Sequence, residues 1–503
     1  MKFKPFLFIL FIFLSAVVLR LAFQFGGVDP FFFKDEQGSA FVQDADSYYY
    51  MYLVNNGILS SGLPLLGFYW HKFIGFFVPG VSVMGSLPWL NFFLFGLTIL
   101  NIFFIAYVLT KSYEAGFFAG LILVLNERFF TGVLNFDTNA LIYFLVSGIA
   151  LFYILIVRHD FKNFRLMNSF WLFLYIDIFL CLFEFFRFSW QGYYFLLFIM
   201  ASSLFCFGLV YLFLKRYKLA TILYIVFGLV VAFVVAFVNW PFKGYIFKGI
   251  KESMGYNSIS ELYSYGWLIF FKIDFPVLLF AVMFFSVYFM VKRKDYAYYF
   301  LGVWLFLMIY ASSQAFRFVY FAVIPFSILG GVLVWEVYNC LDFKARDIVF
   351  LLFFLCLFFV KDYGADREFL VDNSISGLGE VSFPAGSTLV SNWDMGYIVQ
   401  YFTNRETPYK GSPSYDKGIK PLLVNDNETQ FLRDIKGLGE DPYIIWTSHD
   451  QKVLEHWYWI PPSSVIYKLI NQESYYFEIY YYAETPYNWV SVWRLKDGTD
   501  RSL

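Results

Sequence analysis

Long apolar runs separated by short polar joints fill the first 361 residues of the chain. A helix needs about 20 mostly apolar residues to cross a bilayer. The first run, PFLFILFIFLSAVVLRLAF, contains Arg20 and lacks a small-x-small cleavage site, so we interpret it as an uncleaved span and not a signal peptide. The pattern predicts about eleven spans: this run and those at 91–110, 115–130, 138–157, 169–185, 193–214, 219–239, 267–291, 296–311, 318–340 and 347–361. Prolines and basic residues break the 66–90 stretch, for which we expect an interfacial or loop helix.

The joints between these runs alternate in kind. One set is basic, as cytoplasmic loops are, and comprises Lys2 and Lys4, Lys111, Arg158/Lys162/Arg165, Lys215/Arg216/Lys218, Lys292/Arg293/Lys294 and Lys344/Arg346. The other set must then lie outside the cell, together with everything after residue 361. An odd number of spans that starts inside also places the C-terminus outside. We therefore predict an integral protein of the plasma (inner) membrane whose C-terminal domain is periplasmic or extracytoplasmic.

Composition agrees with a polytopic membrane protein. Hydrophobic residues make up 60% of the chain and charged residues only 15%, with a mean hydropathy of +0.60; one soluble core cannot bury that much apolar surface. The net charge of −1 gives no basic field for a nucleic acid. All four cysteines fall in apolar runs, so no disulfide framework or zinc site is predicted.

The last 140 residues or so differ from the rest of the chain. Segments rich in β-branched and aromatic residues, PYIIW, SSVIYKLI, YYFEIYYYAE and WVSVWRLKDG, alternate with turn residues and a few helical stretches. We expect a single mixed α/β domain over 362–503. The membrane domain would then span 1–361, with outer loops at 41–66, 131–138 and 240–266.

Carboxylates gather on the predicted outer face: Asp44, Asp46, Asp137, Glu261 and, in the tail, Asp394. A single acid in such a loop is usually just a solvated residue. A set of acids near a membrane boundary suggests a site, because such groups are costly unless solvated, paired or metal-bound. Mg²⁺ and Mn²⁺ take oxygen ligands, which carboxylates from three outer loops could supply. Whether the loops converge does not follow from spacing alone.

Five segments in fixed order resemble the motifs of one family. NWDMGYIVQYFTNRETPY resembles the WWDYG segment of the catalytic subunit of oligosaccharyltransferase, the PglB/AglB family, in particular its bacterial single-subunit PglB-like members. DADSYYYMYLV resembles the first outer acidic motif, GVLNFDTNALIYF the second, SISE the TIxE motif, and FRFVYFAVIPFSILGG the stretch that carries an arginine. The resemblance implies a helical membrane fold of the GT-C type, with about 11–13 spans and a C-terminal mixed α/β domain. It also implies transfer of a glycan, en bloc, from a polyprenyl pyrophosphate to the Asn amide of Asn-x-Ser/Thr.

The resemblance also assigns roles to individual residues. Asp46, Asp137 and Glu261 would surround a catalytic Mn²⁺ or Mg²⁺, with Asn139 where the second acid of a DxD motif usually stands; Asp44 is the alternative ligand from the first loop. Asp46 and Glu261 would also hold the acceptor amide and act as the catalytic pair. Trp393 and Asp394 would bind the hydroxyl at position +2 of the acceptor, with Asn392 in place of a missing Trp. Further binding residues are implied: Arg317 for the pyrophosphate, Tyr397 near the sugar, and Gln451 and Leu454 against the acceptor.

Two other functions stay open. A GT-C glycosyltransferase that moves a sugar from polyprenyl phosphate to protein hydroxyls or to lipid would share the outer carboxylates but would not need Trp393 and Asp394. A membrane transporter would also be polytopic, although no inverted repeat of broken spans is visible and the outer domain would be unexplained. The partners expected for the first function are a lipid-linked oligosaccharide and an acceptor polypeptide, with the enzyme acting as a monomer.

Overall fold

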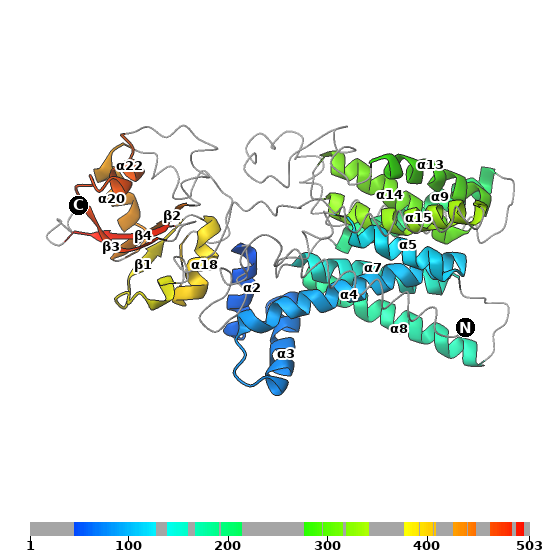
Figure 1. The fold of residues 1–503 in the computed structure, drawn as a ribbon, viewed down its shortest axis with the longest axis horizontal. Helices are drawn as coiled ribbons and strands as arrows, with labels where there is room; N and C mark the ends of the chain where they lie inside the picture. The colour runs from blue at the N-terminus through cyan, green and yellow to red at the C-terminus, as the bar shows by residue number, and fades with distance from the viewer. Residues whose placement is uncertain are drawn as a thin grey trace.

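The computed structural model describes residues 45–126, 138–158, 166–190, 193–213, 276–293, 295–314, 318–341, 377–391, 393–405, 407–408, 426–439, 441–448, 463–484 and 489–496. These residues form a bundle of long helices at one side of the molecule and a small sheet with its helices at the other (Figure 1). The predicted boundary at residue 361 lies outside the described residues, so the division into 1–361 and 362–503 stays a prediction.

In the described part of the chain, eight helices of the bundle lie where apolar runs predict spans: α4 (Val83–Thr110), α5 (Tyr113–Val124), α7 (Thr138–Val157), α8 (Leu166–Ser189), α9 (Tyr193–Phe213), α13 (Pro276–Arg293), α14 (Tyr296–Gln314) and α15 (Val319–Cys340). In the described part of the chain four helices are long and apolar enough to cross a membrane, namely α4, α7, α9 and α15. The spans predicted at the N-terminus, 219–239 and 347–361 lie outside the described residues. The fold class predicted from the apolar runs, a polytopic helical membrane protein, is confirmed.

Small residues allow the central helices to pack closely. An added Cβ on Gly331 of α15 would lie 2.4 Å from the backbone nitrogen of Ala119 on α5. Between α4 and α7, the Asn101 amide donates to Ser147 Oγ at 3.0 Å. Small residues and interhelical hydrogen bonds are the usual means of packing helices in lipid, where no hydrophobic force drives the association.

Two of the predicted helix boundaries were wrong. The span expected at 91–110 begins already at Val83, where the Ser82 hydroxyl caps α4 by accepting from Gly85 N at 3.0 Å. The 66–90 stretch, expected to be an interfacial or loop helix, is therefore divided between α3 (Gly62–Phe77) and the start of α4. The run expected at 115–130 forms a helix only as far as Val124, because the polar Asn126 interrupts the apolar pattern.

In the described part of the tail, four strands form a mixed sheet in the order β1-β2-β4-β3. Its strands are β1 (Thr388–Val390), β2 (Pro442–Thr447), β3 (Phe477–Glu484) and β4 (Trp489–Leu495). β1 pairs in parallel with β2, with Leu389 opposite Tyr443, and the other two pairs are antiparallel. A parallel pair requires a crossover connection, and the helix α18 (Trp393–Thr403) belongs to it.

Both faces of the sheet are covered. On one face Ile444, Trp446 and Trp493 pack with α20 (Glu428–Lys436) and α22 (Val465–Ile470) in a core of their own. SSVIYKLI, expected to be strand-like, contains α22; this prediction was wrong, because Val465, Ile466 and Leu469 have helical spacing and are buried together. The short helix η6 (Gly377–Glu380) precedes β1 and packs near α18.

The other face of the sheet belongs to the core of the membrane helices. Leu389, Ile445 and Val492 join Ile398 and Val399 of α18 in a set of buried side chains that continues into the helix bundle. The connection runs through α2 (Ala45–Asn55), which lies between α18 and the bundle (Figure 1). The tail is therefore packed directly on the membrane part through α2.

Candidate active site

Several described helix ends that border predicted outer motifs in the sequence lie at one end of the helix bundle. α4 begins beside α3, where Trp70 Nε1 donates to Ser86 O at 2.9 Å. α8 ends at that same end, since Ser189 lies against Gly62 at the start of α3. The starts of α9 and α15 meet there too: Trp190 stacks on Phe321 with centroids 5.1 Å apart, and Phe195 on Phe318 at 5.0 Å. The residue Arg317 directly precedes Phe318 in the sequence.

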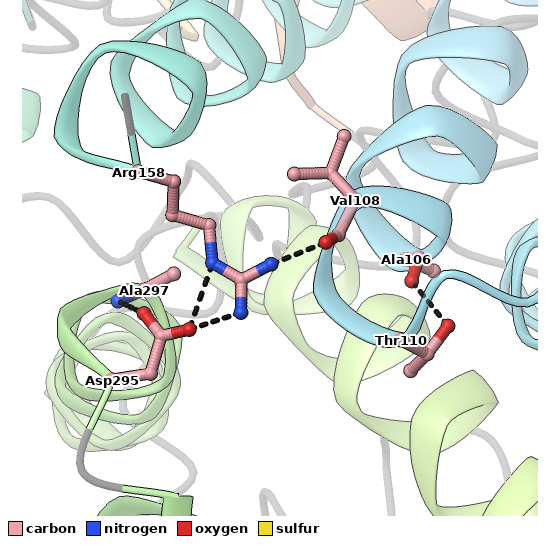
Figure 2. Close-up of polar contacts among 6 residues, drawn as sticks. All are labelled: Ala106, Val108, Thr110, Arg158, Asp295 and Ala297. Carbon is pink, nitrogen blue, oxygen red and sulfur yellow. Dashed lines mark hydrogen bonds and ion pairs between the residues drawn. The ribbon is translucent and has the colours of Figure 1, made fainter. Parts of the chain in front are cut away.

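Arg158, from one of the predicted basic joints, lies at the opposite end, where its contacts connect three helices. Arg158, just after α7, donates through Nε to Asp295 Oδ2 at 2.7 Å, and its other nitrogens contact the same carboxylate and Val108 O of α4 (Figure 2). Asp295 Oδ1 accepts from Ala297 N at 3.0 Å at the start of α14. Because α7 ends here beside the end of α4, it must begin at the end where α4 begins. Asn139, in the first turn of α7, therefore lies at the end of the bundle where α3 packs against the start of α4.

Among the described residues, the helices of two candidate motifs meet at the contact of α2 with α18. Asp46 is the second residue of α2, and Trp393 and Asp394 are the first two residues of α18. Tyr48 joins the helices: it is fully buried, with its ring 5.4 Å from that of Tyr401 and 5.6 Å from that of Phe402. A loop acid and a tail motif almost 350 positions apart in the sequence thus stand on two helices that touch.

The C-terminal end of α18 is held by a residue that sequence reasoning missed. The Arg405 guanidinium donates to Phe383 O at 2.6 Å, Pro384 O at 2.7 Å and Ser387 Oγ at 2.7 Å, and lies 5.8 Å from the centre of the Phe383 ring. Thr407 Oγ1 donates to Gly396 O at 3.4 Å. These contacts tie α18 to the turn before β1. Neither Tyr48 nor Arg405 carries a sequence signal of this role, because both act through residues distant in the chain.

The predicted site residues are described to different extents. Asp46, Trp393, Asp394 and Tyr397 have helical backbone in α2 or α18. Asn139 is half-buried at the start of α7. The remaining predicted residues lie outside the described parts of the chain: Asp44, Asp137, Glu261, Arg317, Asn392, Gln451 and Leu454. Their convergence on one site stays a prediction.

No metal-binding group is visible among the residues that the structure describes: no three of their His, Cys, Asp or Glu side chains come together. Two of the predicted carboxylate ligands, Asp137 and Glu261, are not among those residues. Glu184 and Arg187, near the end of α8, form an exposed ion pair with 2.8 Å between Nε and Oε2. Such an exposed pair contributes little to stability.

The fold defines a class: a helical membrane fold of the GT-C type, with a small mixed sheet and its helices packed through α2 at one end of the helix bundle. No family model matches the chain, and no curated protein is similar to it in sequence. Solved structures are similar to it in fold. The oligosaccharyltransferase of the archaeon Archaeoglobus fulgidus in its apo form superposes with a TM-score of 0.71 over 97% of this chain and 80% of that chain, at 13% identity.

Further structures give the same result. The same archaeal enzyme tethered to an acceptor peptide with an NVT sequon matches with a TM-score of 0.70 over 97% of this chain and 80% of that one, at 12% identity. That enzyme is also described with Zn and sulfate. ArnT from Cupriavidus metallidurans, bound to undecaprenyl phosphate, matches with a TM-score of 0.54 over 95% of this chain and 97% of that one, at 12% identity. At such identities the likeness shows the fold, and at that level it confirms the resemblance read from the motifs.

Proposed function

We propose that this protein is an oligosaccharyltransferase that moves a glycan from a polyprenyl pyrophosphate to the Asn side chain of Asn-x-Ser/Thr. The observation that carries the proposal is the packing of α2 on α18. That packing brings the helix of the predicted catalytic acid Asp46 against the helix of the predicted acceptor motif, Trp393 and Asp394. The fold shared with the archaeal oligosaccharyltransferase supports the same function.

The chemistry requires an activated amide. The lone pair of an amide nitrogen is delocalised into its carbonyl group, so the nitrogen is a weak nucleophile. In the proposed mechanism the carboxylates of Asp46 and Glu261 accept hydrogen bonds from the two N–H groups and favour a twisted amide with a localised lone pair. The nitrogen then forms a bond to the anomeric carbon, the bond from that carbon to the pyrophosphate oxygen breaks, and the nitrogen loses one proton.

The other residues bind the two substrates. Asp394 would accept a hydrogen bond from the hydroxyl at position +2 of the acceptor, while the Trp393 indole N–H donates to the same oxygen. An Asn-x-Ala acceptor leaves these groups unpaired, which is how a polar site rejects the analogue without the hydroxyl. Arg317 would bind the departing pyrophosphate, because a guanidinium pairs with phosphate oxygens in bidentate fashion.

The donor set suits a hard divalent cation. Asp46, Asp137, Glu261 and Asn139 offer only carboxylate and amide oxygens, the ligands that Mg²⁺ and Mn²⁺ prefer. These four residues would hold the ion, with Asn139 supplying a neutral oxygen at the first turn of α7. A bound cation would offset the mutual repulsion of the carboxylates and act as a Lewis acid.

The test is transfer to a fluorescent sequon peptide, measured by mass spectrometry with membranes that contain the protein and a lipid-pyrophosphate oligosaccharide. We expect Asp46→Ala, Asp137→Ala and Glu261→Ala each to lower transfer by about 100-fold or more, at normal protein levels. EDTA should have the same effect. Glu473→Ala, which removes an exposed tail carboxylate, is the matched control and should retain full activity. Full transfer by the three variants, or in chelator, would contradict the site.

The second candidate is a GT-C enzyme that transfers a single sugar from polyprenyl phosphate, which the likeness to ArnT favours. The two functions differ in their need for α18. An oligosaccharyltransferase should lose acceptor affinity in Trp393→Ala and Asp394→Ala, with KM raised by about 10-fold, and these variants should no longer distinguish Thr from Ala at +2. Equal discrimination before and after mutation would favour the second candidate.

A further inference from the structure

A single Asn-x-Ser/Thr sequon, with x other than Pro, occurs in the 503 residues of this chain: Asn427-Glu428-Thr429. It lies in the tail, in the domain that carries the predicted acceptor motif. If the proposed function is correct, this segment has the sequence of a substrate. The function described above makes no use of it.

All three residues of the sequon are engaged in the fold. Asn427 caps α20, with its side-chain Oδ1 accepting from Gln430 N at 3.1 Å. The Thr429 hydroxyl is hydrogen-bonded to Tyr476 Oη at 3.0 Å. The Glu428 carboxylate accepts from the Ser474 hydroxyl and, at 3.5 Å, from Tyr476 N. The sequon is thus fastened to residues 474–476, just before β3.

The residues on both sides are anchored as well. Phe431, Leu432 and Ile435 of α20 are fully buried under the sheet, and the Phe431 ring lies 5.8 Å from that of Phe477. On the other side, Lys468 Nζ donates to Asp426 O at 3.1 Å. The sequon therefore cannot leave the domain surface without opening the first turn of α20.

The proposed reaction needs the same groups to be available. The acceptor amide must twist between two carboxylates, and the hydroxyl at +2 must reach Asp394. In the native tail the amide oxygen is held by a backbone N–H, and the hydroxyl is held by a tyrosine. Asn427 itself is exposed. The hydrogen bonds of the sequon, and not burial of the Asn427 side chain, therefore prevent it from binding as an acceptor.

We propose that Asn427 is an acceptor for this protein's own reaction, and that the contacts of the folded tail block it. Asn427 can then be glycosylated only before the tail has folded. This inference rests on the proposed function. The bond formed would join the Asn427 Nδ2 to the anomeric carbon of the glycan, with release of the lipid pyrophosphate. The closed sequon would keep the mature protein from modifying itself or another folded copy.

The experiment compares the same sequon in and out of the fold. Full-length protein in membranes is incubated with lipid-pyrophosphate oligosaccharide, and mass spectrometry of its proteolytic peptides measures occupancy of Asn427. Parallel reactions contain an unrelated Asn-x-Thr peptide and a synthetic peptide of residues 421–435. We expect both peptides to be glycosylated. The occupancy of Asn427 in the folded protein should be lower by about tenfold or more, because its contacts must break first.

Variants test the cause. The double variant Ser474→Ala/Tyr476→Phe removes the hydroxyl partners of Glu428 and Thr429, and we expect it to raise occupancy of Asn427 about tenfold. Tyr475→Phe changes the neighbouring exposed tyrosine and should leave occupancy unchanged.

Each contrary outcome has its own meaning. Without transfer to the unrelated peptide the proposed function itself fails. If that peptide is glycosylated, three results would overturn this inference: modification of folded Asn427 at the rate of the free peptide, no modification of the 421–435 peptide, or no gain in the double variant. The peptide comparison does not require any variant to fold.

Discussion

Tyr48 is a buried residue at the contact between α2 and α18, the helices that carry Asp46 and Trp393-Asp394. It stands two positions after Asp46, is fully buried, and its ring contacts Tyr401 and Phe402 at the far end of α18. We expect Tyr48→Ala to lower the free energy of unfolding by about 3–5 kcal/mol. In samples that remain folded it should lower kcat for peptide transfer by about 10-fold or more, because small misplacements of reacting groups are costly.

Tyr48→Phe is the matched control, since it keeps the ring and its packing. Unfolding followed by tryptophan fluorescence and steady-state kinetics on one set of samples would measure both effects. Wild-type kinetics in a folded Tyr48→Ala would show that the contact between α2 and α18 does not position the site.

His71 makes stability depend on pH. Its Nδ1 is hydrogen-bonded to Ser86 Oγ at 2.8 Å, and partial burial lowers the pKa of the imidazole from its usual 6.5. The folded state therefore favours the neutral ring. As pH falls below 6.5 the unfolded chain takes up the proton first, so stability present above that pH is lost.

Between pH 7.5 and pH 5 we expect the Tm of the wild type to fall more than the Tm of His71→Gln. The variant lacks the titrating imidazole of residue 71 and keeps the other three histidines. Differential scanning fluorimetry in detergent measures both. An identical pH dependence of Tm in the two proteins would show that His71 does not contribute to it.

At the scale of elements, close contact between α5 and α15 sets the centre of the bundle. Alanine normally stabilises a helix relative to glycine by about 0.5–1 kcal/mol. At Gly331 the added Cβ would meet the Ala119 backbone, so we expect Gly331→Ala instead to destabilise by about 1–3 kcal/mol. Gly75→Ala on α3 is the matched control, because nothing lies within 4 Å of its Cβ. Thermal unfolding of both variants in one detergent measures the difference. Equal Tm values for Gly331→Ala and Gly75→Ala would mean that α15 shifts to accommodate the added Cβ without loss of stability.

For the molecule as a whole, the structure separates the ends of the bundle. Arg158, from a predicted basic joint, pairs with Asp295 at one end, while the α2–α18 contact lies at the other end (Figure 1). With the rule that basic loops face the cytoplasm, this separation predicts that the tail is extracytoplasmic.

In a cysteine-free background, a membrane-impermeant maleimide applied to intact cells should label Asp426→Cys in the tail and not Lys292→Cys at the end of α13. Both positions are exposed, so accessibility in detergent should be equal. Labelling of Lys292→Cys in intact cells would reverse the orientation.

The sequence by itself determined the class of the protein and the position of its long helices. An apolar run of spanning length has one low-energy conformation in a bilayer, the helix, because only a helix satisfies every backbone hydrogen bond within the run. The helices α7, α9 and α15 accordingly begin and end within a few residues of the predicted runs. Helix starts set by a single cap, such as Ser82, and the helical α22 inside a β-rich tail did not follow from composition.

The candidate site divides in the same way. Motif residues such as Asp46 and Trp393-Asp394 could be named from the chain, because carboxylate and indole chemistry is local to the residue. That α2 and α18 touch, through Tyr48, Tyr401 and Phe402, was decided only by the tertiary structure. Packing between segments so distant in the sequence depends on the complementarity of their two buried surfaces. Neither surface can be recognised from the spacing of residues along the chain. The same holds for the closed sequon: Asn427-Glu428-Thr429 reads as an acceptor, and only the fold supplies the Tyr476 and Ser474 that close it.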